Sequence, residues 1–191
     1  MKNIFLFLTV LTLASCFKTN TKTHPVSLLE DYKHDVTFLA DESLEGREVG
    51  TKGEILAATY IAKRMKEIGL ESKGDDNSYF QVFTKKMKAH PHDTLMLGGE
   101  IEGRNVLGFV DNKSEQTIVI GAHYDHLGYG EEGSLADSAG QIHNGADDNA
   151  SGVAAMLGLA NKFKNAKLKS NVLFIAFTGE EKGLWGSNYF V

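Results

Sequence analysis

The sequence predicts an α/β fold, a three-layer α/β/α sandwich built around a mostly parallel, mixed sheet. Two short apolar stretches, residues 117–122 and 171–178, have the character of strands buried on both faces. A helical pattern lies between them, so strand, helix and strand follow one another as in a βαβ unit. A strand that is apolar on both faces needs helices on both sides of its sheet, which gives the three layers.

Two helices are predicted ahead of these strands. Ser27 and Glu30 form a capping box, and apolar residues at helical spacing continue the first helix to about residue 40. Thr51 and Glu54 form a second capping box. An apolar stripe follows the second box, and a glycine at position 69 ends that helix.

The remaining elements are read from shorter patterns. A partly alternating stretch near residues 79–87 and the apolar run 104–110 are predicted strands. After Gly152, apolar residues recur at helical spacing and predict the helix of the βαβ unit. The last ten residues predict the start of a further helix.

The composition is that of a globular domain. The chain has 191 residues, of which 42% are hydrophobic and 24% are charged, enough for one domain with a core. Its formal net charge of -5 does not favour nucleic-acid binding, which requires a basic face. We therefore expect no nucleic-acid partner.

The first 26 residues are predicted to lie outside the fold. Residues 1–15 combine a lysine, an apolar run and small residues, which is typical of a signal peptide. The ending "LASC" resembles the lipobox of bacterial lipoproteins, which implies cleavage before Cys16 and a lipid on its thiol. Residues 16–26 then form a lipidated cysteine and a polar tether, and a bacterial cell-envelope location follows, with the protein anchored to a membrane by its lipid. The alternative is a plain signal peptide with an incidental cysteine.

Three polar stretches lie next to the predicted elements of the βαβ unit. Two of them follow the predicted strands, and the third leads into the predicted helix. They read "GAHYDHLG" at 121–128, "NGADDNASG" at 144–152 and "FTGEEKGLWGS" at 177–187. In α/β sheets, sites form outside the carboxyl ends of the strands, so these stretches are expected to converge.

The residue types in these stretches suit a divalent metal such as zinc, which binds imidazole nitrogen and carboxylate oxygen. Asp125 lies two residues after His123 and can orient the ring instead of binding metal. The pair Glu180 and Glu181 offers one carboxylate for the metal and one for proton transfer. Each stretch alone is also compatible with a polar strand end, a solvated helix start or a capped turn.

Taken together, the three stretches and "LADESLEGREVGTKGE" resemble the M28 family of zinc peptidases, from about residue 27 to the last residue. The resemblance implies a zinc-exopeptidase-like fold and two zinc ions. It implies that His123 is a ligand, that Asp125 orients His123, and that Asp147 bridges the two ions. It further implies that Glu180 is the general base and that Glu181 is a metal ligand.

The resemblance carries two further expectations. The peptide bond after the bridging aspartate, here Asp147–Asp148, is expected to be cis. In the family, two more ligands, an aspartate and a histidine, come from later in the chain. His126 and His143 are not expected to replace them, but either to contact the ligands without binding metal or to lie on the surface. Residues 27–191 are accordingly expected to be the N-terminal part of an M28-like domain, incomplete on its C-terminal side.

The activity implied by the resemblance is the hydrolysis of peptide bonds, removing N-terminal amino acids from peptide substrates. One alternative is a zinc enzyme related to glutaminyl cyclases. Another is a catalytically inactive fragment, or a binding module that keeps the fold without the reaction.

Overall fold

The computed structural model describes residues 28–87, 98–130, 132–135 and 140–191. The signal peptide, the lipidation of Cys16 and the cap at Ser27 lie outside the described residues and stay predictions. Among the residues that are described, no helix has both the length and the apolar character needed to cross a bilayer.

A five-stranded sheet forms the middle of the molecule. Its order is β1-β3-β5-β4, and β2 also pairs with β3. The strands are β1 (Glu71–Ser72), β2 (Phe80–Lys86), β3 (Glu100–Val110), β4 (Thr117–His123) and β5 (Asn171–Phe177).

The sheet is mixed, as predicted, but it is not mostly parallel within the described residues. Only β4 and β5 run parallel, whereas β1, β2 and β5 each pair antiparallel with β3. The parallel pair is the one that a helical crossover joins, as predicted for a βαβ unit. The expectation of a mostly parallel sheet was wrong for this part of the chain, because the long strand β3 has antiparallel neighbours on both sides.

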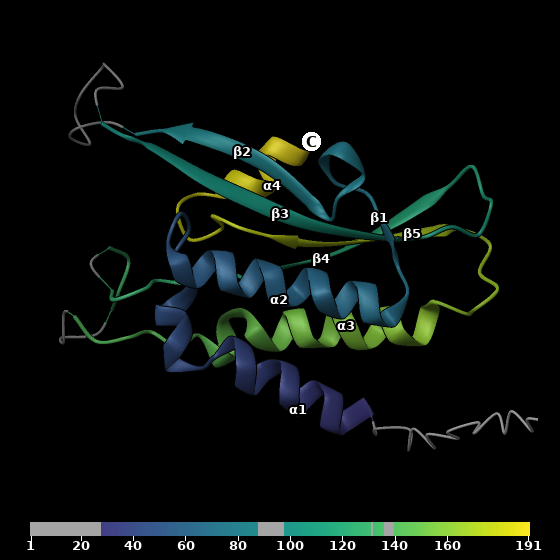
Figure 1. The fold of residues 1–191 in the computed structure, drawn as a ribbon, viewed down its shortest axis with the longest axis horizontal. Helices are drawn as coiled ribbons and strands as arrows, with labels where there is room; N and C mark the ends of the chain where they lie inside the picture. Colours follow the sequence, from purple (N-terminus) through teal and green to yellow (C-terminus); the bar gives the residue numbers. More distant parts are fainter. Residues whose placement is uncertain (1–27, 88–97, 131, 136–139) are drawn as a thin grey trace, which may run out of the picture.

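Helices lie on both faces of the sheet, which confirms the predicted α/β class. Figure 1 shows α2 and α3 side by side beneath the sheet, with α1 packed outside α3 and the short α4 on the opposite face. The helices are α1 (Leu28–Leu39), α2 (Lys52–Ile68), α3 (Ser151–Phe163) and α4 (Trp185–Phe190).

The core lies between the sheet and the pair α2 and α3. Strand β5 lies between β3 and β4 and is buried along most of its length, as its apolar sequence predicts. Strand β4 differs, since Ile118 and Val119 are each about half exposed. In the described residues β4 pairs only with β5, and α4 packs against β2 and β3. The expectation that residues 117–122 are covered on both faces was therefore wrong.

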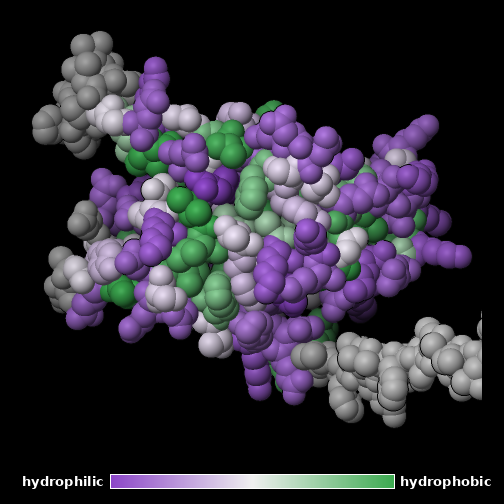
Figure 2. Space-filling view, viewed as in Figure 1, coloured by the Kyte–Doolittle hydropathy of each residue, from purple (hydrophilic) through white to green (hydrophobic). Residues whose placement is uncertain are grey.

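The outer surface carries most of the polar residues. Figure 2 shows hydrophilic side chains over most of the face seen there, with hydrophobic residues gathered in a band across its middle.

The second predicted helix begins and ends as expected, with one difference at its cap. The Thr51 hydroxyl accepts the backbone N–H of Glu54, and Gly69 ends α2 in the left-handed conformation, with φ 93°. The Glu54 carboxylate, however, does not complete the capping box. It is fully buried and accepts the hydroxyl of Tyr124, so it joins α2 to the segment just after β4.

This buried carboxylate makes the stability of the fold depend on pH. Burial raises the pKa of Glu54 to about 7, although Tyr124 and Arg104 act in the opposite direction. A carboxyl group whose pKa is higher in the folded state stabilises the fold below its unfolded pKa, and this contribution is lost as the pH rises through about 7. We expect the melting temperature of the wild type to fall more steeply than that of Glu54→Gln between about pH 5 and 8.

Thermal unfolding at several pH values measures this difference. Glu67→Gln is the matched control, because Glu67 lies on the same helix with its side chain about half exposed. The control should keep the wild-type slope. Equal slopes for the wild type and Glu54→Gln would show that this carboxylate is ionised in the folded protein at pH 5.

Candidate metal centre

The three polar stretches meet at the carboxyl ends of β4 and β5, as predicted. His123 is the last residue of β4 and pairs in register with Phe177, the last residue of β5. Glu180 and Glu181 follow in the next turn, and the segment Ala146–Ala150 leads into α3. Parallel strands end at one edge of the sheet, so residues far apart in sequence come together there.

Asp125 ties the two strand ends together from a fully buried position. Its carboxylate accepts the backbone N–H groups of Glu180, at 3.2 Å, and Glu181, at 3.3 Å. The Nδ1 atom of His123 lies 3.2 Å from the Asp125 carbonyl oxygen and 3.7 Å from a carboxylate oxygen of the same residue. Asp125 thus fixes the ring of His123 and the backbone of both glutamates.

The ring of His123 is oriented by this contact. A carbonyl oxygen only accepts, so Nδ1–H donates to it, and Nε2 is the nitrogen left to bind a metal once it has lost its proton. Nε2 lies 3.1 Å from an Asp148 carboxylate oxygen and 4.0 Å from one of Glu180. Burial lowers the pKa of His123, but the Asp125 and Glu180 carboxylates outweigh burial and raise it to about 9.

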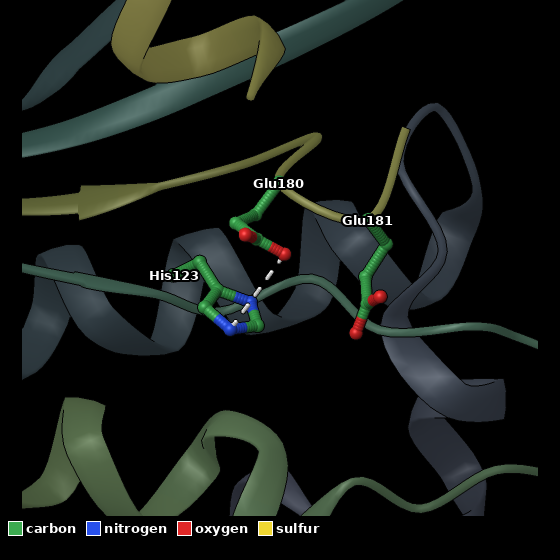
Figure 3. Close-up of side chains that lie close together, drawn as sticks. All are labelled: His123, Glu180 and Glu181. Atoms are coloured by element: carbon green, nitrogen blue, oxygen red, sulfur yellow. Dashed lines mark ion pairs between the residues drawn. The ribbon is translucent and has the colours of Figure 1, made fainter. Parts of the chain in front are cut away.

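The two glutamates take different directions from one loop. Figure 3 shows Glu180 pointing toward the His123 ring and Glu181 extending beside it. An oxygen of Glu181 lies 2.8 Å from Nδ1 of His126, so this ring holds the Glu181 carboxylate in place. The side chain of His126 is only 11% exposed, which places it inside the cluster and not on the surface.

Asp148, and not its neighbour Asp147, faces the histidines. Asp148 joins His126 and Glu181 in a group whose possible ligand atoms lie within 4.8 Å of one another. Asp147 is exposed, and among the described residues its side chain makes no ion pair with either histidine. The cis peptide bond is Asp148–Asn149, so the expectation of a cis bond at Asp147–Asp148 was wrong by one residue.

The cluster fits a zinc ion by its chemistry. His123, Glu180 and Glu181 form a second group with possible ligand atoms within 4.8 Å of one another. Zinc bonds of 2.0–2.2 Å place tetrahedral ligands ~3.5 Å apart, a spacing that small side-chain rotations here would reach. Imidazole nitrogen and carboxylate oxygen are the atoms zinc prefers, and the ring of His123 is already held by its second nitrogen.

A cavity of about 300 Å³ opens beside the cluster. His123 and Glu180 contribute to its wall, whereas Glu181 does not. Its other walls are mostly small or apolar, and they include Ala122, Phe177 and Leu184. A ligand in this cavity would therefore meet Glu180 directly.

One feature of the site was not anticipated from the sequence. Arg47 was assigned no role, although its buried side chain reaches the segments on either side of the cluster. No local pattern marks this residue. His126, by contrast, was expected either to contact the ligands or to lie on the surface, and its ring contacts Glu181.

The model of peptidase family M28 matches residues 105–191. The alkaline phosphatase isozyme conversion protein of Escherichia coli (strain K12) is 30% identical over 156 residues, which are 81% of this chain and 42% of that protein. A probable zinc metalloprotease of Pyrenophora tritici-repentis is 27% identical over 154 residues, covering 80% of this chain and 33% of its own length. The chain thus spans less than half the length of these relatives.

Among solved structures, the glutaminyl cyclase of Fimbriiglobus ruber superposes with a TM-score of 0.62. It is 21% identical, and the match covers 88% of this chain and 55% of the cyclase. This likeness establishes the fold. The family match covers β4, β5 and every residue of the cluster, so residues 105–191, the part that carries the site, are similar to peptidase family M28.

Proposed function

We propose that this site binds zinc and hydrolyses peptide bonds, releasing N-terminal amino acids. The observation that carries the proposal is that His123 lies close to Asp148 and Glu181, with Glu180 beside them in the wall of an open cavity. The match of residues 105–191 to family M28 and the name of the Pyrenophora relative support a zinc-dependent peptidase.

The ligands we propose are His123 through Nε2, Asp148 and Glu181. Asp148 would take the role that the family resemblance implied for Asp147, because its carboxylate lies against His123 and in the group with His126. Two ions remain the number implied by the family resemblance. His126 supports the centre by holding Glu181 through Nδ1.

Glu180 is the residue we assign as general base. Its side chain lines the cavity and is 38% exposed, whereas Glu181 is 18% exposed and held by His126. Bound zinc would polarise the scissile carbonyl and lower the pKa of a water molecule toward ~7. Glu180 would take a proton from that water and pass it to the leaving amine.

The charge of the site and the shape of the cavity both favour binding of the N-terminal end of a peptide. Glu180, which is not a proposed ligand, places a carboxylate in the cavity wall, and its negative charge would attract the α-ammonium group of a peptide. The apolar wall at Ala122, Phe177 and Leu184 offers space for the first side chain of that peptide. Both features favour cleavage after the first residue.

Glutaminyl cyclisation is the second candidate, because the fold is shared with the Fimbriiglobus cyclase. A carboxylate base beside the histidine serves either reaction, since hydrolysis removes a proton from water and cyclisation removes one from the attacking α-amine. A binding module without activity is the third reading. Anchoring in the bacterial cell envelope through Cys16 also remains a proposal, supported by the "LASC" sequence.

Product analysis separates these functions. Two peptides that differ only in their first residue, leucine or glutamine, are incubated with the zinc-loaded protein and examined by mass spectrometry. We expect the leucine peptide to lose its first residue and a chelator to stop the reaction. Loss of ammonia from the glutamine peptide, with the leucine peptide intact, would instead identify a cyclase, and no change in either would favour a binding module.

A further inference from the structure

Arg47 is a fully buried cation whose side chain points at backbone carbonyls. Its Nε donates to the Tyr124 carbonyl at 2.7 Å, and its two terminal nitrogens donate to Asn144 at 2.6 Å and Gly145 at 2.9 Å. A fourth acceptor is the carbonyl of Leu39 at the end of α1. One side chain therefore joins three separate segments.

Two of these segments carry the proposed centre. Tyr124 lies between His123 and Asp125 in the chain. Asn144 and Gly145 directly precede Ala146–Ala150, the turn that presents Asp148. Any movement of these carbonyls would therefore move the groups that face the zinc site.

The backbone around Arg47 is built to reach this position. Gly46 has φ 70°, and a Cβ placed there would lie 2.5 Å from the Gly128 carbonyl oxygen and 2.7 Å from that of His143. The backbone N–H of Gly128 donates to Gly46 at 3.2 Å, and that of His143 donates to Gly128 at 2.8 Å. The turn thus lies between the same two loops that the guanidinium joins.

The charge of Arg47 is compensated by these carbonyls. Within the described ranges, no carboxylate lies within ion-pair distance of its guanidinium, so its hydrogen bonds go to the backbone. Burial lowers its pKa to about 10, while attraction to Asp125 and Asp148 acts in the opposite direction. The group therefore remains charged at neutral pH and lies on the same side of the fold as two acidic residues of the site.

We propose that Arg47 is a positioning residue of the metal centre, holding the Tyr124, Asn144 and Gly145 carbonyls so that His123 and Asp148 keep their metal-binding spacing. This inference rests on the proposed zinc site. A planar guanidinium donates in several fixed directions at once, whereas a lysine ammonium is a compact point charge with three donors. Charge alone would not reproduce the arrangement.

The test compares Arg47→Met and Arg47→Lys with Arg64→Met. Arg64 is the matched control, because it is also largely buried and bonded, but to Asp35 on α1. Zinc affinity is measured by titration with Zn²⁺ alone against a chelator, and the folded fraction is measured by thermal unfolding. We expect both Arg47 variants to bind zinc roughly 10–100-fold more weakly, the usual effect of losing a supporting contact. Arg64→Met should lower the melting temperature without changing zinc affinity.

A second measurement follows amide hydrogen exchange in the metal-free protein. The N–H of His143 and of Ala150, which donates to Gly145 at 3.2 Å, should exchange faster in Arg47→Lys, while α2 exchanges as in the wild type. Unchanged exchange at these amides would overturn the proposal, even if the wild type bound no zinc and the proposed function failed. Wild-type zinc affinity in Arg47→Lys would also overturn it, as would an equal loss in Arg64→Met.

Discussion

Replacing Glu180 by glutamine is expected to lower the rate of peptide hydrolysis by roughly 10²–10⁴-fold while bound zinc stays at the wild-type level. Glutamine keeps the size of the side chain and its place in the cavity wall, but it cannot accept a proton. Since Glu181, not Glu180, is held by His126, the ligand set should remain intact.

The measurement is turnover of a leucyl peptide together with zinc content after dialysis. Glu132→Gln is the matched control, because Glu132 is an exposed neighbour that pairs with Lys182 near the same loops. It should leave both quantities unchanged. Loss of zinc in Glu180→Gln, with no separate defect in turnover per bound zinc, would mean that the roles of Glu180 and Glu181 are exchanged.

The part of the fold that local pattern determines was predictable from the sequence. The βαβ unit around α3 follows from two apolar strands and one helical stripe, and α2 follows from Thr51 at its start and Gly69 at its end. The partners of β3 were not predictable in this way, because pairing depends on contacts between residues far apart in sequence. The exposure of β4 at the sheet edge has the same cause.

Part of the site was predictable, because the spacing of residues at a strand end determines the direction in which their side chains point. His123 and Asp125 stand two residues apart at a strand end, and the structure brings both beside Glu180 and Glu181. The choice between Asp147 and its neighbour depends instead on backbone angles inside a tight turn, which the residue types do not specify. His126 and Arg47 act through loops that only the complete fold brings together.

Replacing Asp148 by asparagine is expected to weaken zinc binding strongly. The substitution removes the negative charge that lies 3.1 Å from Nε2 of His123 and that belongs to the group with His126 and Glu181. Loss of a direct ligand should weaken binding by more than the roughly 10–100-fold that loss of a supporting contact costs. Its side chain is 60% exposed, so folding should be little affected.

The proposed metal site consists of His123, Asp148 and Glu181, and a titration with zinc tests this assignment. Zinc affinity is measured for the wild type, Asp148→Asn and Asp147→Asn under the same chelator competition. The two variants make the same change at neighbouring exposed positions of one turn. We expect Asp148→Asn to lose tight zinc binding and Asp147→Asn to keep it. Tight binding in Asp148→Asn with loss in Asp147→Asn would contradict the site described here and return the bridging role to Asp147.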